Sequence, residues 1–278
     1  MSSKVVVITG TSSGIGLATA VAAARAGWRT VATMRDTGRD GALRKAAEQA
    51  GVEIDVRQLD VNDDASVTAA IAGVVADHGQ LDALVNNAGR GHVAVAEHDT
   101  VEDVRAVMEV NFLGVVRTTL AALPHLRASR GRLVTVTSVG GVVGQPFNEA
   151  YCAAKFAVEG YMESLAPVLG RFGVGVSVVE PGPVATEFIN NLGVDPAEII
   201  AAAGPYTEPV QAYIGHALKH FDEAQTPAEA AGPILEALTA ERPPFRIQTS
   251  EWVRGFAGTK LADLDGSAVQ TAMSEWVA

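Results

Sequence analysis

The fold of this chain is decided by the stretch Val5-Val6-Val7-Ile8-Thr9-Gly10-Thr11-Ser12-Ser13-Gly14-Ile15-Gly16. Residues 5–9 are apolar or β-branched and predict a strand, and an Ala-rich helix is expected over 14–26. Glycines let the backbone turn sharply and approach a ligand closely. A helix N-terminus presents unpaired N–H groups and a partial positive charge. Between a strand and a helix, the spacing G-x-x-x-G-x-G favours a site for a nucleotide pyrophosphate over a simple tight turn.

The same alternation of short apolar runs and Ala-rich stretches continues to Glu180. Further strands are predicted at 30–34, 54–59, 81–86, 132–138 and 174–180, and helices at 38–50, 63–78 (with Asn62 as N-cap), 101–127 and 149–171. The strand segments are continuously apolar, as expected of parallel strands that are covered on both faces. The sequence therefore predicts an α/β fold, with one Rossmann-like, doubly wound parallel sheet of about seven strands and helices on both faces.

The pattern changes after Glu180. Residues 181–206 are rich in Pro, Gly and Asn, helices are expected near 210–221 and 227–240, and 245–249 is a candidate last strand. The tail to Ala278 has weak periodicity. Since no linker or internal repeat interrupts the chain, we expect one domain over 1–278 with a C-terminal extension.

Composition and charge argue against several classes of protein. The chain has 278 residues, with 21 Lys and Arg against 32 Asp and Glu, so its formal net charge is −11. That charge disfavours nucleic acid as a partner, because phosphate backbones bind basic surfaces. Because Cys152 is the only cysteine, no intrachain disulfide can form, and a cytoplasmic location is expected. The apolar run at the N-terminus is too short for a signal peptide, and no segment is expected to reach the ~18 apolar residues of a membrane span.

The end of the second strand bears on the choice of cofactor, since it is where the adenosine ribose of a dinucleotide is expected. The chain reads Thr33-Met34-Arg35-Asp36 there. Met34 is a poor partner for a ribose hydroxyl, whereas Arg35 could form charge-assisted hydrogen bonds to a 2′-phosphate. Asp36 would repel that phosphate if its carboxylate pointed the same way. We therefore expect NADP(H) in preference to NAD(H), the alternative being that Arg35 is only a solvated charge.

Candidate catalytic residues follow from the 149–171 helix, where Tyr151 and Lys155 share a face at positions i and i+4. A nearby ammonium group lowers the pKa of a phenol, which can then exchange a proton with an alcohol or carbonyl oxygen. Ser138 ends the preceding strand, at the edge of the sheet where ligands bind in this fold. Asn111 is a polar residue among apolar ones, and it is either a satisfied core amide or part of the site.

Taken together, these motifs resemble the short-chain dehydrogenase/reductase family. The matching elements, in family order, are Thr9-Gly10-x-x-x-Gly14-Ile15-Gly16, Asp60-Val61, Asn86-Asn87-Ala88-Gly89, Asn111, Ser138, Tyr151-x-x-x-Lys155, and Pro181-Gly182 with Thr186. The resemblance implies that Tyr151 is the general acid/base and that Ser138 polarises the substrate oxygen. It also implies that Lys155 binds the nicotinamide ribose and lowers the Tyr151 pKa, and that Asn111 holds a water molecule in a proton relay.

The resemblance also assigns the cofactor site. It implies that Asp60 and Val61 flank the adenine and that the segment 181–186 holds the nicotinamide. The residues expected to bind the cofactor are Gly10, Ser12, Ser13, Gly14, Ile15, Gly16, Arg35, Asp60, Val61, Asn87, Ala88, Gly89, Tyr151, Lys155, Pro181, Gly182, Val184 and Thr186. Residues 4–186 would form the cofactor-binding and catalytic core, and 187–278 a substrate flap and C-terminal extension. No metal site is expected, because the histidines lack the spacing of metal ligands.

Within the family, the chain resembles the branch of 17β-hydroxysteroid and photoreceptor retinol dehydrogenases. The stretches that carry this are Ser138-Val139-Gly140-Gly141, Tyr151-Cys152-Ala153-Ala154-Lys155-Phe156-Ala157-Val158-Glu159-Gly160 and Ala32-Thr33-Met34-Arg35-Asp36. The branch uses NADP(H), and a C-terminal histidine and a late glutamate hold the far end of a steroid. His216 matches that histidine, whereas Trp276 stands where the branch has its glutamate.

Apolar side chains in 187–213 and near Ser138 predict an apolar substrate pocket that is closed by a mobile flap. The residues expected to contact substrate are Val142, Val143, Phe147, Phe188 and His216. The alternative is that these side chains only cover the edge of the sheet.

The function predicted from the sequence is NADP(H)-dependent interconversion of a ketone or aldehyde and its alcohol. The substrate is expected to be a bulky hydrophobic small molecule of hydroxysteroid or retinoid type. The alternatives are a nucleotide-sensing protein that has lost the chemistry, a structural partner in a larger assembly, and a ketoreductase for fatty-acyl or polyketide intermediates. Retention of Ser138, Tyr151 and Lys155 favours an enzyme over a sensor. The resemblance further implies a homodimer or homotetramer that pairs through the two long helices.

Overall fold

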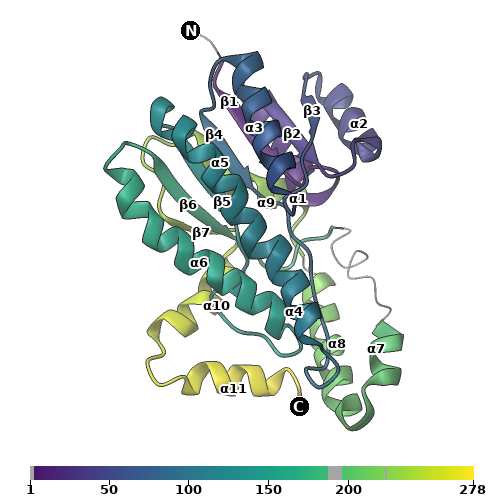
Figure 1. Cartoon of the computed structure of the whole chain (residues 1–278). Coiled ribbons are helices and arrows are strands. Elements are labelled where there is room, and N and C mark those ends of the chain that lie inside the picture. The colour runs from purple at the N-terminus through teal and green to yellow at the C-terminus, as the bar shows by residue number, and fades with distance from the viewer. Residues whose placement is uncertain (1–2, 187–195, 223) are drawn as a thin grey trace.

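A computed structural model describes residues 3–186, 196–222 and 224–278. Its centre is a seven-stranded parallel sheet in the order β3-β2-β1-β4-β5-β6-β7 (Figure 1). The strands are β1 (Val5–Thr9), β2 (Arg29–Met34), β3 (Asp55–Gln58), β4 (Ala83–Asn86), β5 (Arg132–Val136), β6 (Gly175–Glu180) and β7 (Arg246–Gln248). The order runs outward in both directions from β1 and β4, so the predicted doubly wound α/β sheet is confirmed.

Helices cover both faces of this sheet. Those that pack on it are α1 (Gly14–Arg25), α2 (Gly41–Ala50), α3 (Asp64–His78), α5 (Gly114–Ser129), α6 (Glu149–Gly170) and α9 (Pro227–Thr239). In Figure 1, α3, α5 and α6 lie in front of the sheet and α1 and α9 lie behind it. Val5 and Val7 of β1 belong to the core under α3, α5 and α6, and Val6 and Ile8 to the core under α1, α2 and α9. The central strand is apolar in every position but its last, Thr9, because both of its faces are buried.

The predicted boundaries of two helices needed correction. The helix expected at 38–50 begins at Gly41, since Asp36 accepts a hydrogen bond from the backbone N–H of Gly38 and opens a separate short turn, η1 (Thr37–Arg39). The N-cap of α3 is Asp63, not Asn62. A carboxylate oxygen of Asp63 accepts from the backbone N–H groups of Ala65 and Ser66 at 2.8 and 3.2 Å, which is the contact that an N-cap side chain makes.

The helix predicted over 101–127 contains a break in its hydrogen-bond pattern. A π turn, η2 (Glu109–Leu113), separates α4 (Val101–Met108) from α5. By length and composition alone, the helical run 101–129 is apolar enough to cross a membrane. Its α5 part packs on the sheet through Val115, Ala122 and Leu126, so burial in the core accounts for these apolar residues.

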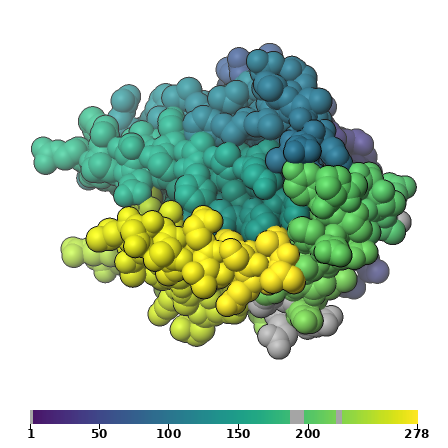
Figure 2. Space-filling view, turned by 90° about the horizontal axis from the view of Figure 1, so that it is seen from below, coloured from purple at the N-terminus to yellow at the C-terminus, as the bar shows by residue number. Residues whose placement is uncertain are grey.

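The C-terminal part of the chain adds a layer beyond the carboxyl ends of the strands. It contains α7 (Pro196–Ala202), the turn η5 (Gly204–Tyr206), α8 (Thr207–Asp222), α10 (Glu251–Ala262) and α11 (Ser267–Glu275). The sequence did not predict α7, α10 or α11, because short helices with many small residues give a weak period. Figure 2 shows α11 and α8 side by side on this face, and the ring of His216 on α8 packs, tilted by 31°, against that of Trp276 after α11.

Candidate active site

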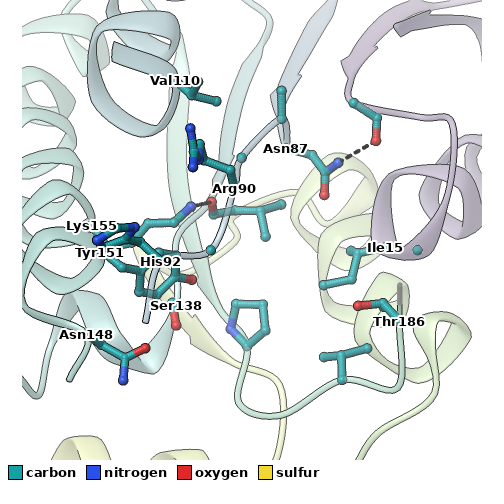
Figure 3. A pocket seen from close by; sticks show the side chains of 18 of the residues that line it. Ile15, Asn87, Arg90, His92, Val110, Ser138, Asn148, Tyr151, Lys155 and Thr186 are labelled. Atoms are coloured by element: carbon teal, nitrogen blue, oxygen red, sulfur yellow. Dashed lines mark hydrogen bonds between the residues drawn. The ribbon is translucent and has the colours of Figure 1, made fainter. Parts of the chain in front are cut away.

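A cavity of about 1050 Å³ opens at the carboxyl ends of β1, β2, β4, β5 and β6. Every residue that the sequence predicted to bind the cofactor lines it, and so do Ser138 and His216. Figure 3 shows part of this lining, with Ile15, Asn87, Ser138, Tyr151, Lys155 and Thr186 labelled. These residues come together because the ends of parallel strands meet at one edge of the sheet, where the winding direction reverses. Asn111, Val142, Val143 and Phe147 are not among the lining residues, and Phe188 lies outside the described part of the chain.

The glycine turn after β1 fits a dinucleotide. Gly10 has a φ of 70°, and a Cβ atom there would lie 2.7 Å from the Cα of Ala88. A Cβ on Gly16 would lie 2.3 Å from the side-chain nitrogen of Asn87, which itself donates hydrogen bonds to the carbonyls of Thr9 and Gly10 at 2.9 and 3.0 Å. Only glycine fits in these two positions, and the turn is therefore held open toward the cavity.

The N-terminus of α1 faces the same cavity. Its N-cap, Ser13, has an extended backbone and makes no side-chain capping bond. The first residues of the helix, Gly14, Ile15 and Gly16, line the cavity, so the orphan N–H groups of this turn are placed to bind an anionic group. The observed turn and helix end thus have the shape and the donors that a pyrophosphate requires.

Two arginines line the part of the cavity that lies just beyond the end of β2. Arg35 follows β2, and Arg39 ends η1. The carboxylate of Asp36, which also lines the cavity, accepts from the N–H of Gly38 at 2.9 Å. Arg39 was not predicted to line the cavity, because the sequence analysis placed it inside a helix over 38–50, whereas it ends the separate η1 turn.

Ser138, Tyr151 and Lys155 converge on the cavity from two elements. Ser138 precedes the turn η3 (Val139–Gly141), and its Oγ accepts from the N–H of Gly140 at 3.0 Å. Tyr151 lies in the first turn of α6 and hydrogen-bonds Ser138. The N–H of Val139 donates to the carbonyl of Pro181 at 2.8 Å, which fixes the Pro181 loop beside the serine.

The pKa of Tyr151 runs opposite to the sequence prediction. Burial raises it to about 12, and the hydrogen bond to Ser138 only partly opposes that effect. The Nζ atom of Lys155 lies 5.8 Å from the centre of the Tyr151 ring and donates to the carbonyl of Val136 at 3.2 Å. Lys155 is itself buried, which lowers its pKa to about 8. In this structure desolvation therefore outweighs any effect of the ammonium group on the phenol.

The side chain of Asn111 is satisfied by the backbone. Its oxygen accepts from the N–H of Arg90 and its nitrogen donates to the carbonyl of Arg90, each at 2.8 Å. Asn111 is fully buried within the π turn, and a Cβ on Gly89 would lie 3.0 Å from its side-chain oxygen. The asparagine thus holds the loop after β4 in place, and its predicted role in binding a water molecule stays a prediction.

The substrate end is built differently from the sequence prediction. Val142 and Val143 are buried against Ala257, Val269 and Met273, and they hold α10 and α11 in place without lining the cavity. Phe147 packs on Tyr213, with ring centres 5.4 Å apart. None of these three predicted contact residues lines the cavity. The two valines are covered by α10 and α11, which the sequence did not predict, and Phe147 is packed against α8.

A ladder of aromatic rings forms that wall. His216 and Trp276 are in tilted contact with ring centres 4.4 Å apart. Trp276 and Phe256 stack with centres 5.6 Å apart, and Phe256 and Trp252 with centres 5.2 Å apart. His216, Trp252, Trp276 and Tyr213 also line the cavity. We call the four residues His216, Trp276, Phe256 and Trp252 the ring ladder. Except for His216, its members were missed, since their pairing is long-range and leaves no local pattern.

The doubly wound sheet, the glycine turn and the Ser–Tyr–Lys group define a dinucleotide-binding oxidoreductase. A family model described as short chain dehydrogenase matches residues 4–196. The chain belongs to the short-chain dehydrogenase/reductase family, as the sequence motifs had indicated.

Similar proteins lie in the branch that the sequence pointed to. The chain is 40% identical to 17-beta-hydroxysteroid dehydrogenase type 1 of Homo sapiens, over 98% of this chain and 85% of that protein. It is 39% identical to retinol dehydrogenase 8 of Bos taurus, over 95% of this chain and 87% of that protein. The solved structure of a short-chain dehydrogenase from Streptomyces avermitilis matches with a TM-score of 0.76 and 33% identity, over 99% of this chain and 96% of that one.

Two further solved structures were determined with different cofactors. One is a short chain dehydrogenase/reductase from Burkholderia phymatum in complex with NAD, with a TM-score of 0.79 and 26% identity over 95% of each chain. The other is a single-substitution variant of actinorhodin polyketide ketoreductase with NADPH, with a TM-score of 0.74 and 28% identity, over 89% of this chain and 97% of that one. The cofactor of this chain is thus a nicotinamide dinucleotide, and its 2′ group must be inferred from the chain's own residues.

Proposed function

We propose that this chain is an NADP(H)-dependent oxidoreductase that interconverts a bulky hydrophobic ketone or aldehyde and its alcohol. The observation that carries the proposal is the meeting of Ser138, Tyr151 and Lys155 in the cavity that also contains the glycine turn. Hydroxysteroids and retinoids are the substrate types named for the relatives at 40% and 39% identity. Both substrate types are flat and largely apolar, and such molecules pack favourably against the aromatic side chains of the ring ladder.

The roles of the residues follow from their geometry. When bound, the nicotinamide cofactor supplies or accepts a hydride. In the reductive direction Tyr151 donates a proton to the carbonyl oxygen, and a pKa of about 12 keeps its hydroxyl protonated at neutral pH. Ser138, already bonded to Tyr151, donates to the same oxygen and orients it. Lys155 holds a positive charge beside the phenol as it loses its proton.

The preference for NADP(H) rests on Arg35 and Arg39. Guanidinium groups form charge-assisted hydrogen bonds with phosphate oxygens. The carboxylate of Asp36 is engaged by the N–H of Gly38 in its own turn, which reduces the repulsion that the sequence suggested. At the position expected for a 2′-phosphate, the attraction of two guanidinium groups therefore outweighs the repulsion from one carboxylate that already accepts a hydrogen bond.

A homo-oligomer and a cytoplasmic location belong to the same proposal. Apolar side chains are exposed on α5 and α6, including Leu120, Phe156 and Val168, and these are the helices through which the family resemblance implies pairing. The free and buried thiol of Cys152 supports a reducing compartment.

The proposal is tested by following NADPH oxidation with steroid ketones, retinal and small aromatic ketones, using wild-type protein and Tyr151→Phe. We expect turnover with the bulky apolar carbonyls and a loss of about 100- to 10,000-fold in Tyr151→Phe, the range that general acid catalysis contributes. The variant should still bind NADPH, because it lacks only one hydroxyl group. Equal turnover by Tyr151→Phe would contradict the assigned role, and binding without turnover by the wild type would favour a nucleotide sensor.

A further inference from the structure

Three ionisable side chains meet where α6, β6 and β7 pack together, and none of the three lines the cavity. They are Glu159 on α6, Glu180 at the end of β6 and Arg246 at the start of β7, and we call them the acid–arginine cluster. The Nε atom of Arg246 lies 3.4 Å from an oxygen of Glu159 and 3.5 Å from an oxygen of Glu180. Glu159 is 5% exposed and Glu180 is fully buried.

The cluster holds more negative groups than its one arginine can satisfy. Among the described residues, Oε1 of Glu159 and Oε1 of Glu180 are buried and accept no hydrogen bond, although Oε1 of Glu180 is the oxygen that lies 3.5 Å from Nε of Arg246. The other oxygen of Glu180 accepts from the side chain of Gln248 at 2.9 Å, and Arg246 also donates to the exposed Glu163 at 2.6 Å. Buried polar atoms without a partner are rare in native proteins and call for an explanation.

Lys155 is a second buried cation on the helix that carries Glu159. It precedes Glu159 by four residues on α6, so the two buried side chains share one face of the helix. Lys155 bonds the carbonyl of Val136, and the Glu159 carboxyl lies against the hydroxyl of the next residue, Thr137. Both side chains are thus anchored on the same end of β5.

The negative charge of Glu159 acts on the pKa of Lys155 in the direction expected of a counter-charge. Burial lowers the pKa of Lys155 to about 8, and the negative charge of Glu159 opposes that change. Burial also raises the pKa of Glu159 to about 7, an effect opposed by Thr137 and Arg246 and reinforced by Glu180. Because two carboxyl groups share one guanidinium, they titrate as a coupled pair.

We propose that Glu159 is a positioning residue which, anchored by Arg246, supplies the buried negative charge that keeps the Lys155 ammonium group protonated next to Tyr151. The groups around Glu159 come from every element that packs there. They are Lys155 and Glu163 on α6, Thr137 after β5, Glu180 on β6, and Arg246 and Gln248 on β7. Among these, Arg246 holds the Glu159 carboxylate in place, and the negative charge of that carboxylate stabilises the protonated form of Lys155.

The kinetic test compares the pH profiles of kcat/KM for carbonyl reduction in the wild type, Glu159→Gln, Glu159→Asp and Glu163→Gln. Activity of the wild type should fall above about pH 8, as Lys155 loses its proton. In Glu159→Gln this alkaline limb should move to lower pH by about one pH unit, the size of effect that one close opposite charge has on a pKa. Glu159→Asp retains the charge and should stay nearer to the wild type.

Glu163→Gln is the matched control, because it removes an exposed carboxylate from the next turn of the same helix that bonds the same arginine. Its alkaline limb should coincide with that of the wild type. Thermal unfolding and NADPH binding establish that each variant is folded. A folded Glu159→Gln enzyme with the wild-type alkaline limb would overturn the proposal.

A second measurement needs no substitution at Glu159. In the NMR spectrum of wild-type protein labelled with [13C]lysine, the Cε resonance of Lys155 is identified by its loss in Lys155→Met. We expect it to show the ionisation of Lys155 in the alkaline range and a second inflection near neutral pH from Glu159. A single inflection would overturn the proposal. The inference rests on the proposed function only for its kinetic readout, so a failure to find turnover would count against that function while the NMR titration still decides this one.

Discussion

The carboxyl group of Glu159 makes the stability of this protein depend on pH. Its folded-state pKa of about 7 lies above the ordinary value of 4.5, so the folded chain binds this proton more tightly than the unfolded chain. Glu159 therefore favours the folded state at low pH, and this contribution is lost as the pH rises from about 4.5 through 7.

Glu159→Gln should remove that dependence. Relative to the wild type, its free energy of unfolding should rise by up to about 3 kcal/mol between about pH 5 and about pH 8. Urea denaturation at the two pH values measures the difference, with the exposed Glu163→Gln as the control that should show little change. A constant difference between wild type and Glu159→Gln would show that the carboxyl has an ordinary pKa.

The two arginines after β2 carry a prediction about the cofactor. Replacing both Arg35 and Arg39 by alanine removes the cations proposed to bind a 2′-phosphate. Since a hydrogen bond to a charged group contributes roughly 1.5–3 kcal/mol, the affinity for NADPH should fall by about 10- to 100-fold per lost contact. Calorimetric titration with NADPH and NADH separates this effect from misfolding, because NADH binding should be unchanged. Parallel loss of both cofactors would contradict the assignment.

At the level of elements, α10 and α11 bring the ring ladder to the cavity. Trp276→Ala removes its central ring, which contacts both His216 and Phe256. The KM for steroid or retinoid substrates should rise by about tenfold, because aromatic contacts contribute about 0.5–1.5 kcal/mol beyond the area they bury. The KM for a small ketone should change little. Leu264→Ala, at a fully exposed position between the two helices, is the control, and equal effects on large and small substrates would contradict a role for the ladder in substrate size.

The elements of the core were predictable because local pattern and burial agree there. β1 is apolar in every position but its last, since both of its faces are covered, and the glycines of the next turn are fixed by close backbone contacts. The same reasoning placed all the expected cofactor residues around the cavity. It failed for Val142 and Val143, whose apolar side chains are covered by α10 and α11, because an apolar residue near a site looks the same whether it faces a ligand or another helix.

The sequence also misjudged groups whose properties depend on burial. The i and i+4 spacing of Tyr151 and Lys155 was correct, yet burial raises one pKa and lowers the other. The acid–arginine cluster joins residues from α6, β6 and β7 that are far apart in the chain. Such charge networks depend on the packing of distant segments, which no local window of sequence contains.

At the scale of the whole molecule, the exposed apolar side chains of α5 and α6 predict self-association. Light scattering should give a mass of twice or four times the 28.8 kDa of one chain. Leu120→Asp, at a position that is 57% exposed, should shift the mass toward that of the monomer and leave NADPH binding intact. A wild-type protein that is monomeric at micromolar concentration would contradict the proposed pairing.

The last strand of the sheet has a consequence for how the protein is made. β7 pairs with β6, and Arg246 lies beside Val178 although it follows Glu180, the end of β6, by 66 positions in the chain. At roughly 5–20 residues per second, a ribosome needs about 3–13 s to synthesise that stretch. During this interval β6 is an open edge that offers unpaired backbone groups to other chains. Nascent protein should therefore be most prone to aggregate, and most dependent on chaperones, after the nucleotide-binding half has been synthesised and before residue 246 leaves the exit tunnel.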